Sequence, residues 1–574
     1  MLEDRIFRCG ASDFYGDEIG LCNSTHTDDR LKAISDAGFN GIWLRGKLRD
    51  LVPGKLFNDF VDNPTKRLSQ LIKLCRRAQK FQLGIWLNMI EPHGLETNHS
   101  FWEKNPDLAG PSIKIMQEPR QNALCSSTPQ VRDFLCSGFN KLFSKAPLRG
   151  VILMTSSEQV NNCWAHVLSS PQTYSSPETF WFKRCQCPRC EPRGPIEIIS
   201  EILNLITSGI KLANSQARVV AWDWSWNMHC EPPYKKIIDR LDKNIILMGD
   251  FERGGLVQRA GKNMEVEEYS LCYAGPSARF RKETRMVANN RPMFAKLQLN
   301  TTHELATVPN LPLVVSLYRK FSFLRNNKAA GFMGTWNFAC NPDTLNTFAV
   351  NLLCQKINIG NETAFLKRLA QKYFGEEVDH KNVVKAWYAF LRAGQSYPIN
   401  GNKFVYWSCV NYALGYPLKC KFDDSPMGPS WLPHNSGSRP EASLGGLTLP
   451  EVVALLKKLS ASWQKGLELY QNALAPVVGT KNANKEIATA VIAGCSFRST
   501  YNVYRWYRLR RRKTKTALGT SERVIVIDEI ENLKNALLYL KNNHEFGYHE
   551  ESKWRVYDET TINKKIQNLS GMIT

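Results

Sequence analysis

Residues 150–154 have the sequence Gly150-Val151-Ile152-Leu153-Met154, a short apolar run rich in β-branched side chains. In the amphipathic stretch that follows, isoleucines recur at helical spacing, at positions 199, 202, 206 and 210. Residues 218–224 then return to a strand-like composition. A strand, a helix and a second strand in this order predict two parallel strands joined by a helical crossover.

The same alternation extends over the first 345 residues. Helical stripes also occur at Leu68, Leu71, Cys75 and Ala78, and at Val131, Leu135, Phe139 and Leu142. Eight strands are predicted: 39–44, 83–90, 150–154, 218–224, 244–248, 268–273, 293–299 and 331–337. Eight parallel strands with helices between them favour an α/β fold of the TIM type, a (β/α)8 barrel. A doubly wound open sheet is the alternative, disfavoured because the chain has no glycine-rich phosphate loop.

One part of this pattern leaves two alternatives open. Fewer than 20 residues separate the runs 244–248 and 268–273, which is too short for a normal helical crossover. The segment between them contains Gly254, Gly255 and Gly261. It could therefore form a hairpin, in which case an early strand near residues 6–10 would complete the eight.

From about residue 342 the strand pattern gives way to helices. Pro450 opens a helix with one apolar face, formed by Val452, Leu455, Leu459, Trp463, Leu467 and Tyr470. Residues 525–540 predict another helix, and residues 423–446 are rich in Pro, Gly and Ser and predict a long loop. We therefore expect a barrel domain at 1–345 and a mainly α-helical domain at 346–574.

The balance of charge restricts the partners that we expect. The 574 residues carry 75 Lys and Arg against 53 Asp and Glu, a net charge of +22, which favours polyanions such as acidic polysaccharides, nucleic acids or anionic membranes. The N-terminal sequence lacks a basic start followed by an apolar run, and no stretch has 18 apolar residues in succession. These features predict a cytoplasmic protein without membrane contact. They do not indicate an oligomeric state.

Polar and aromatic side chains gather where the predicted strands end. Carboxylates and indoles together are typical of a sugar site, because glycoside cleavage uses two carboxyl groups and flat indoles cover pyranose rings. Each residue also has a structural alternative, such as a helix cap or a satisfied buried group. The candidates are Glu91, His93, Glu158, Trp222, Asp223, Trp224, Asn300, His303, Glu304, Trp336 and Asn337.

Four cysteines have the spacing of a metal site. Cys187 and Cys190 form a Cys-x-x-Cys pair, and Cys185 and Cys163 could complete a tetrahedral set. The prediction is one structural zinc ion, with a cluster of free thiols or a disulfide as the alternative. Such a closed site would hold the loop after residue 158 and would take no part in the chemistry.

A basic stretch near the C-terminus has two interpretations. Residues 505–515 contain seven Arg and Lys residues interleaved with Trp506 and Tyr507. They could bind phosphates while the aromatic rings stack on bases. The preferred interpretation is a solvated helix face whose aromatic side chains pack inward, so nucleic acid is a disfavoured partner.

Several short motifs resemble a known family. They are Ala37–Leu44, Glu91-Pro92, Asn105–Gly110, Leu124-Cys125-Ser126, Ser157-Glu158, Cys187–Cys190 and Ala221–Trp226. In this order they are similar to bacterial barrel proteins related to glycoside hydrolase family 20, the β-N-acetylhexosaminidases. The resemblance covers about residues 30–345, and the helical tail, with Ala386-Trp387-Tyr388 and Tyr397-Pro398, is similar to the C-terminal part of the same proteins.

The resemblance implies a role for Glu158. Family 20 ends its catalytic strand in Gly-Gly-Asp-Glu, where the glutamate is the general acid and the aspartate orients the substrate acetamido group. The glutamate matches Glu158, but Ser157 stands at the aspartate position. This departure leaves room for a protein nucleophile, and Glu304 follows the strand where many retaining barrel hydrolases hold theirs.

These observations together predict a glycoside hydrolase. Glu158 is the expected general acid/base, Glu304 or Asp223 is the expected second carboxylate, and the remaining candidates bind substrate. The substrate would be a carbohydrate, either amino-sugar-containing or anionic, with Arg45 or Arg253 contacting its negative groups. The alternative from a different class is a non-catalytic carbohydrate-binding protein on a degenerate barrel.

Overall fold

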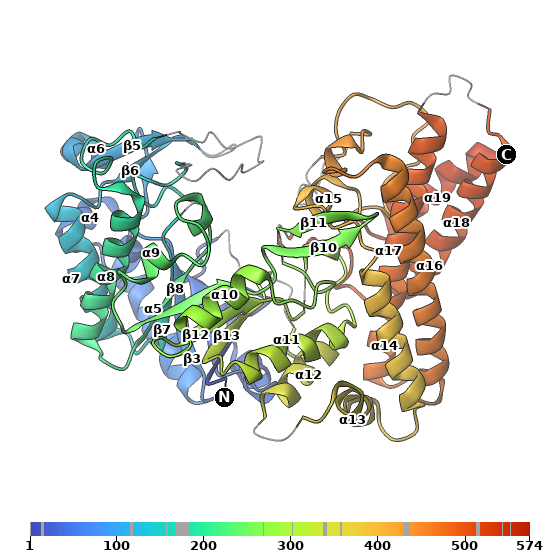
Figure 1. The fold of residues 1–574 in the computed structure, drawn as a ribbon, viewed down its shortest axis with the longest axis horizontal. Coiled ribbons are helices and arrows are strands. Elements are labelled where there is room, and N and C mark those ends of the chain that lie inside the picture. Colours follow the sequence, from blue (N-terminus) through green and yellow to red (C-terminus); the bar gives the residue numbers. More distant parts are fainter. Residues whose placement is uncertain are drawn as a thin grey trace. The chain divides into compact units, whose positions relative to one another are not determined.

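The computed structural model describes residues 2–573, apart from 13–15, 115–118, 157–158, 168–183, 268, 301, 337–340, 356–358, 429–436, 512–516, 542 and 552. Eight parallel strands close into a barrel in the order β1-β13-β12-β9-β8-β7-β3-β2 (Figure 1). Their bounds are β1 Asp4–Phe7, β2 Gly41–Arg45, β3 Gly84–Met89, β7 Gly150–Met154, β8 Arg218–Trp222, β9 Ile245–Asp250, β12 Met293–Leu297 and β13 Gly331–Gly334. The predicted TIM-type barrel is therefore confirmed.

The eight strands differ from the preferred set at one place. β1 is the early strand that the alternative required, and it closes the barrel by pairing with both β2 and β13. Residues 269–273 form no strand. The glycine-rich segment before them is an antiparallel hairpin of β10 Gly255–Arg259 and β11 Lys262–Val266. The prediction of a strand at 268–273 was wrong because its apolar side chains belong to a buried loop.

The chain divides into two compact units. Unit 1 comprises Met1–Asp250, Arg279–Lys296 and Asn327–Gly334, and it contains the barrel. Its longer helices are α2 Asp28–Asp36, α5 Pro64–Gln79, α7 Pro129–Lys145, α8 Gly194–Ala213 and α10 Ala278–Val287, and α7 packs against α8. A small antiparallel sheet of β4 Leu95–Glu96, β5 Ala109–Ile113 and β6 Gln121–Leu124 is inserted between β3 and α7. The helices predicted from the stripes near 71, 135 and 202 are α5, α7 and α8.

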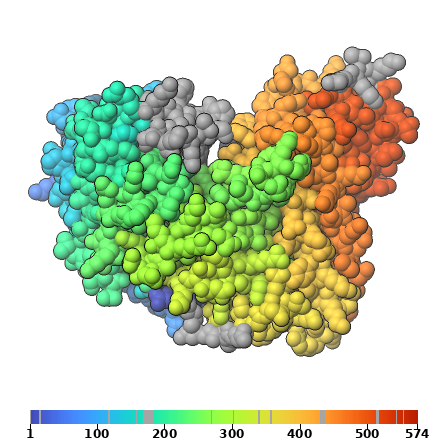
Figure 2. All heavy atoms as spheres, viewed as in Figure 1, coloured from blue at the N-terminus to red at the C-terminus, as the bar shows by residue number. Residues whose placement is uncertain are grey.

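Unit 2 comprises Phe251–Ala278, Leu297–Asn326 and Thr335–Thr574, and it is mainly helical. Its hairpin β10–β11, green in Figure 2, reaches the surface, where the Leu256 side chain is 64% exposed. None of the helices described here has a stretch long and apolar enough to span a membrane. The longer helices are α11 Val314–Asn326, α12 Leu345–Cys354, α13 Glu362–Phe374, α14 His380–Gly394, α16 Leu449–Leu474, α17 Lys481–Arg510, α18 Thr520–Leu540 and α19 Glu559–Ile573.

The described part of the basic stretch belongs to the end of α17. Tyr504, Trp506 and Tyr507 are buried in unit 2. Arg505 pairs with Asp528 on α18 at 2.7 Å. The aromatic side chains therefore pack inward, as the preferred interpretation expected, and residues 512–516 lie outside the described residues.

The two faces of the barrel strands carry different side chains. Paired residues on adjacent strands face the same side, so the registers define one set that points inward. Three inward positions are glycines, and a Cβ atom at Gly41 or Gly150 would lie within 2.8 Å of the Trp86 indole. At Gly331 it would lie 2.8 Å from the Phe294 ring. The glycines thus leave room for two aromatic rings to fill the barrel.

We predict that Gly150→Ala destabilises the barrel, because the new Cβ would lie 2.4 Å from the Arg218 backbone oxygen as well as against Trp86. The cost should be about 1–3 kcal/mol, as for other overpacked cores. Thermal unfolding measures it. The matched control is Gly571→Ala in α19, where no atom of the described residues lies within 4 Å, and which should leave stability unchanged or slightly raised. Equal melting temperatures for the two variants would contradict the packing argument.

Candidate functional site

The last inward-facing residues of the strands form what we call the rim set. They are Arg45 on β2, Asn88 on β3, Met154 on β7, Trp222 on β8, Asp250 on β9, Lys296 on β12 and Met333 on β13, with Arg8 just beyond β1. In a barrel of parallel strands these positions stand at the C-terminal end, where catalytic groups are found. The outward-facing neighbours are aliphatic, so the polar residues are concentrated inside the barrel.

Asp250 is the acidic member of the rim set, and three groups surround it. The Trp222 indole Nε1 donates to its Oδ1 at 3.0 Å, and the Arg279 Nη2 donates to its Oδ2 at 3.1 Å. Lys296 is its register partner on β12, and its Nζ lies 5.8 Å from the Trp222 ring centroid. Two donors to opposite oxygens fix the orientation of the carboxylate, and the arginine charge stabilises it.

A second charged member of the rim set is also firmly held. The Arg8 Nη1 lies 2.5 Å from the Glu18 Oε1, and the guanidinium carbon lies 4.1 Å from the centroid of the Trp43 ring. Both charged side chains are buried. A buried ion pair stacked on an indole restricts the arginine to one place inside the barrel.

Asp223, a predicted catalytic carboxylate, lies on the other side of β8. It directly follows Trp222, so its side chain points toward α10, where its Oδ2 is 3.8 Å from the Arg279 Nη2. Glu283 is one helical turn further along α10 and reaches the β9 backbone at Gly249. Burial is the main cause that raises the pKa of Asp223 to about 7, and the nearby Asp250 adds to it against the opposing charge of Arg279.

The loop after β3 shows a structural role for Glu91. Its Oε1 accepts from the Leu48 N–H at 2.6 Å, at the start of α3 Leu48–Leu51, and its Oε2 accepts from the His93 N–H at 3.2 Å. Burial holds the pKa of His93 well below its usual range, with the charges of Arg49 and Lys47 adding to the effect. The ring is therefore neutral, and its Nδ1 contacts the Gly94 oxygen at 3.2 Å.

Glu158 and Ser157 lie outside the described residues, but the chain on both sides of them is anchored. Asn161 and Asn162 donate to the carbonyls of Met154 and Thr155 at the end of β7, at 3.4 and 2.8 Å. The predicted general acid therefore belongs to a short loop whose ends are tied to the fourth strand of the barrel.

Cys163 belongs to a buried cluster with Cys125, Cys187 and Cys190, whose four sulfur atoms lie within 4.8 Å of one another. Four sulfurs bound to one tetrahedral ion at about 2.3 Å would be about 3.8 Å apart. The Cys125 Sγ lies 3.7 Å from that of Cys187 and 3.6 Å from that of Cys190, so the geometry fits such an ion. The cluster could therefore hold a metal.

This cluster differs from the predicted set in one member. Cys125, which follows β6, takes the place that the spacing assigned to Cys185. The Cys185 Sγ instead donates to the Cys163 backbone oxygen at 3.0 Å. Residue 125 is far from the others in sequence and reaches them only because the inserted sheet brings it there. Sequence spacing therefore carried no signal for it.

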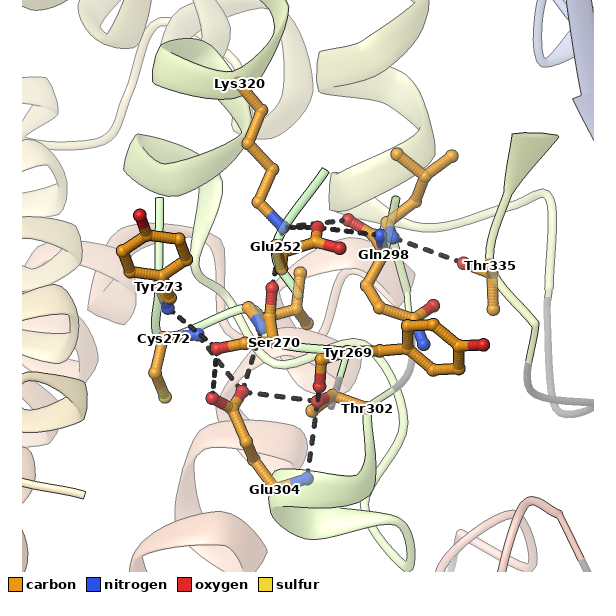
Figure 3. A network of polar contacts seen from close by, with 12 residues as sticks. Glu252, Tyr269, Ser270, Cys272, Tyr273, Gln298, Thr302, Glu304, Lys320 and Thr335 are labelled. Atoms are coloured by element: carbon orange, nitrogen blue, oxygen red, sulfur yellow. Dashed lines mark hydrogen bonds and ion pairs between the residues drawn. The ribbon is translucent and has the colours of Figure 1, made fainter. Parts of the chain in front are cut away.

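Glu304 lies in unit 2, in the polar network of Figure 3. Its Oε1 accepts from the Ser270 Oγ. Its Oε2 accepts from the backbone N–H groups of Leu271 and Cys272, at 2.9 and 3.1 Å, and from the Thr302 Oγ1 at 3.2 Å. Nearby, Lys320 pairs with Glu252, which also accepts from the Gln298 N–H. Both oxygens of Glu304 are thus used to hold the 270–272 loop.

Other predicted site residues in unit 2 also have structural contacts. The Asn300 Nδ2 donates to the Asn310 Oδ1 and the Thr344 Oγ1, at 2.9 and 3.2 Å. The His303 Nε2 lies 3.4 Å from the Glu551 Oε2. Arg253 pairs with Glu267, Trp336 is half-buried, and Asn337 lies outside the described residues. In unit 1, Trp224 is buried with its ring 5.7 Å from that of Trp222.

The structure brings together several residues that the sequence did not single out, namely Arg8, Asn88, Asp250 and Lys296. Each occupies the inward parity of a strand, at or just beyond its C-terminal end. The signal existed in the sequence, because a polar residue that alternates with aliphatic ones near a strand end is unusual in a buried parallel strand. Using it requires the register, which the sequence alone leaves open.

Comparisons with known proteins agree on the fold. No protein-family model and no curated protein matches the sequence. A solved GH138 enzyme targeting pectin rhamnogalacturonan II is 11% identical, with a TM-score of 0.54 over 100% of this chain and 66% of that structure. An O-GlcNAc hydrolase mutant from Thermobaculum terrenum is 9% identical, with a TM-score of 0.38 over 99% of this chain and 94% of its own. A β-N-acetylhexosaminidase from Bacteroides fragilis is 10% identical, with a TM-score of 0.29 over 54% and 52%.

The first of these similarities covers the helical region as well as the barrel. It supports, at the level of the fold, a carbohydrate-cleaving enzyme in general. A specific relation to family 20 stays a prediction.

We predict that Asp223 makes folding pH-dependent. Its pKa is raised to about 7 in the folded protein, so the folded chain keeps a proton that the unfolded chain releases near pH 4. Stability should therefore fall as the pH rises from about 4 to 7, by on the order of 3 kcal/mol, and level off above. Denaturant unfolding of the wild type and Asp223→Asn measures this difference. Parallel stability curves for the two proteins would refute it.

Proposed function

We propose that this chain is a glycoside hydrolase whose site is the rim set inside the barrel of unit 1. The observation that carries the proposal is Asp250, an inward-facing carboxylate at the C-terminal end of β9 that Trp222 and Arg279 orient. A carboxylate beside an indole is the pairing that sugar cleavage requires. The whole-chain similarity of fold to a pectin-targeting glycoside hydrolase is consistent with it.

In the proposed reaction Glu158 is the general acid and Asp250 is the second carboxylate. Glu158 donates its proton to the glycosidic oxygen as the bond to the anomeric carbon breaks. Asp250 then either takes a proton from the attacking water or attacks the anomeric carbon itself, in which case water later releases the sugar. Glu158 recovers its proton from that water in the second route.

Asp250 is preferred to the two carboxylates expected from the sequence. All the lone-pair directions that Glu304 uses are occupied by donors of its own loop, so attack by this group would first break four hydrogen bonds. Asp223 points toward α10, and its raised pKa keeps it largely protonated near neutral pH, which weakens a nucleophile or base.

The rim set also favours an anionic substrate. Arg8, Arg45 and Lys296 are basic, and Asp250 is the acidic member. Lys296 is fully buried next to that carboxylate, which suits a group that contacts a uronate or sulfate inside the barrel. An amino sugar remains the second candidate, from the resemblance to family 20. Arg253, which pairs with Glu267, is no longer part of this proposal.

We predict that Glu158→Gln and Asp250→Asn each lower kcat by about 10²- to 10⁴-fold, because each amide keeps the shape but transfers no proton and carries no charge. Release of reducing ends from pectin, oligogalacturonides and chitooligosaccharides measures the activity. Asp133→Asn on the exposed face of α7 is the matched control and should be fully active. NMR of the first-formed anomer separates a nucleophile from a base.

Two outcomes would decide against the reaction. Full activity of Asp250→Asn would remove this residue from the mechanism. Binding of these glycans by the wild type without any hydrolysis would favour the alternative, a carbohydrate-binding protein on a degenerate barrel, which Ser157 in place of an aspartate also suggests.

We further propose that the cysteine cluster holds one structural zinc ion. Buried sites of four cysteines with this separation of sulfurs are typical of tetrahedral zinc, which would neutralise the thiolates and fix the segments that meet there. The Arg189 Nε contacts the Cys125 Sγ at 3.2 Å, and the Ser127 Oγ contacts the Cys190 Sγ at 3.1 Å. Such outer contacts orient metal ligands.

We predict about one zinc ion per chain, lost in Cys125→Ser and kept in Cys185→Ser. The two variants are matched in chemistry, but only Cys125 belongs to the cluster. Elemental analysis of protein purified without added metal measures the content, and Cys125→Ser should also melt at a lower temperature. The reverse pattern would support the set expected from the sequence, and no metal in the wild type would refute the zinc site.

A further inference from the structure

Asn88 is the one rim residue for which neither the fold nor the reaction above has a use. It is fully buried, on the inward parity of β3, with Arg45 and Ile152 as register partners on the adjacent strands. Neither its Oδ1 nor its Nδ2 has a hydrogen-bond partner among the described residues. Its backbone oxygen, in contrast, accepts from the Gly46 N–H at 3.2 Å. The strand is thus satisfied and the amide is not.

An unpaired buried amide is costly for folding. Each donor or acceptor left without a partner costs about 1–3 kcal/mol, and a leucine of similar size would avoid this cost. The same chain uses another buried asparagine closely. Asn346, also fully buried, donates its Nδ2 to the Leu299 and Leu311 oxygens at 2.8 and 3.0 Å. An unsatisfied amide inside the barrel therefore points to a partner outside the protein.

The chemistry of the amide defines that partner. Asn88 offers one acceptor and one donor side by side, which matches two neighbouring hydroxyl groups, one donating and one accepting. The loop after the same strand adds a second atom without a partner in the described part of the chain, the buried Nε2 of His93. Because the ring is neutral and its Nδ1 faces the Gly94 oxygen, this Nε2 is an acceptor. Both β3 and its loop therefore present polar atoms suited to hydroxyl groups.

We propose that Asn88 is a sugar-binding residue that reads a pair of adjacent hydroxyl groups of the ligand. The ligand class rests on the proposed function, but the assignment of Asn88 as a ligand contact does not require hydrolysis. A site that binds a hydroxyl pair by an otherwise unpaired amide rejects a sugar lacking one of them, because the amide is then left unsatisfied. Asn88 would in this way determine which sugar is accepted.

The first experiment compares the stability of leucine variants without ligand. Asn88→Leu should melt at or above the wild-type temperature, because it removes an unpaired polar group and keeps the volume. The matched control Asn346→Leu should melt several degrees lower, since it leaves two backbone oxygens without donors. A comparable loss in Asn88→Leu would show that the amide serves the fold and would overturn the proposal.

The second experiment measures binding by saturation-transfer NMR with D-glucose, D-galactose, D-galacturonate and N-acetyl-D-glucosamine as probes. At least one should bind the wild type and bind Asn88→Leu on the order of tenfold more weakly. Equal binding by both proteins, or no binding of any probe to the wild type, would overturn the proposal. Binding that depends on Asn88 in a protein that hydrolyses no glycan would uphold it while the proposed reaction fails.

Discussion

The packing of Trp86 and Phe294 inside the barrel is the constraint on which the site depends. Gly41, Gly150 and Gly331 leave the space that these rings occupy, and each would clash with them if it carried a side chain. Because the rings fill this part of the barrel, polar residues that follow them along the strands are supported from below. The indole of Trp222 can then hold Asp250, and Lys296 can lie beside both.

Most of the fold follows from local pattern. The stripes of α5, α7 and α8 and the apolar runs of seven barrel strands are visible as periodicity, because buried parallel strands and amphipathic helices leave strong signals. The sixth expected strand was wrong because residues 269–273 are apolar for a different reason. Their loop is buried around Glu304, which binds its backbone. Composition cannot distinguish a buried loop from a short buried strand.

The site was less predictable because it depends on which face a residue occupies. Asp223 and Asp250 both stand at the ends of aliphatic strands, yet one faces α10 and the other faces the inside of the barrel. A shift of one residue in the register would exchange these roles. Cys125 shows the same limit at longer range, since the inserted sheet brings it to the other three cysteines.

The pairing of β1 with β13 has a consequence for how the chain acquires its structure during synthesis. β1 is made first, but one of its two neighbours, residues 331–334, is made more than 300 residues later. Until then one edge of β1 has unpaired backbone groups, and contacts so distant in sequence form slowly. The cysteine cluster, in contrast, is complete once residue 190 has left the ribosome. The nascent chain therefore assembles its inserted sheet early and circularises its barrel late.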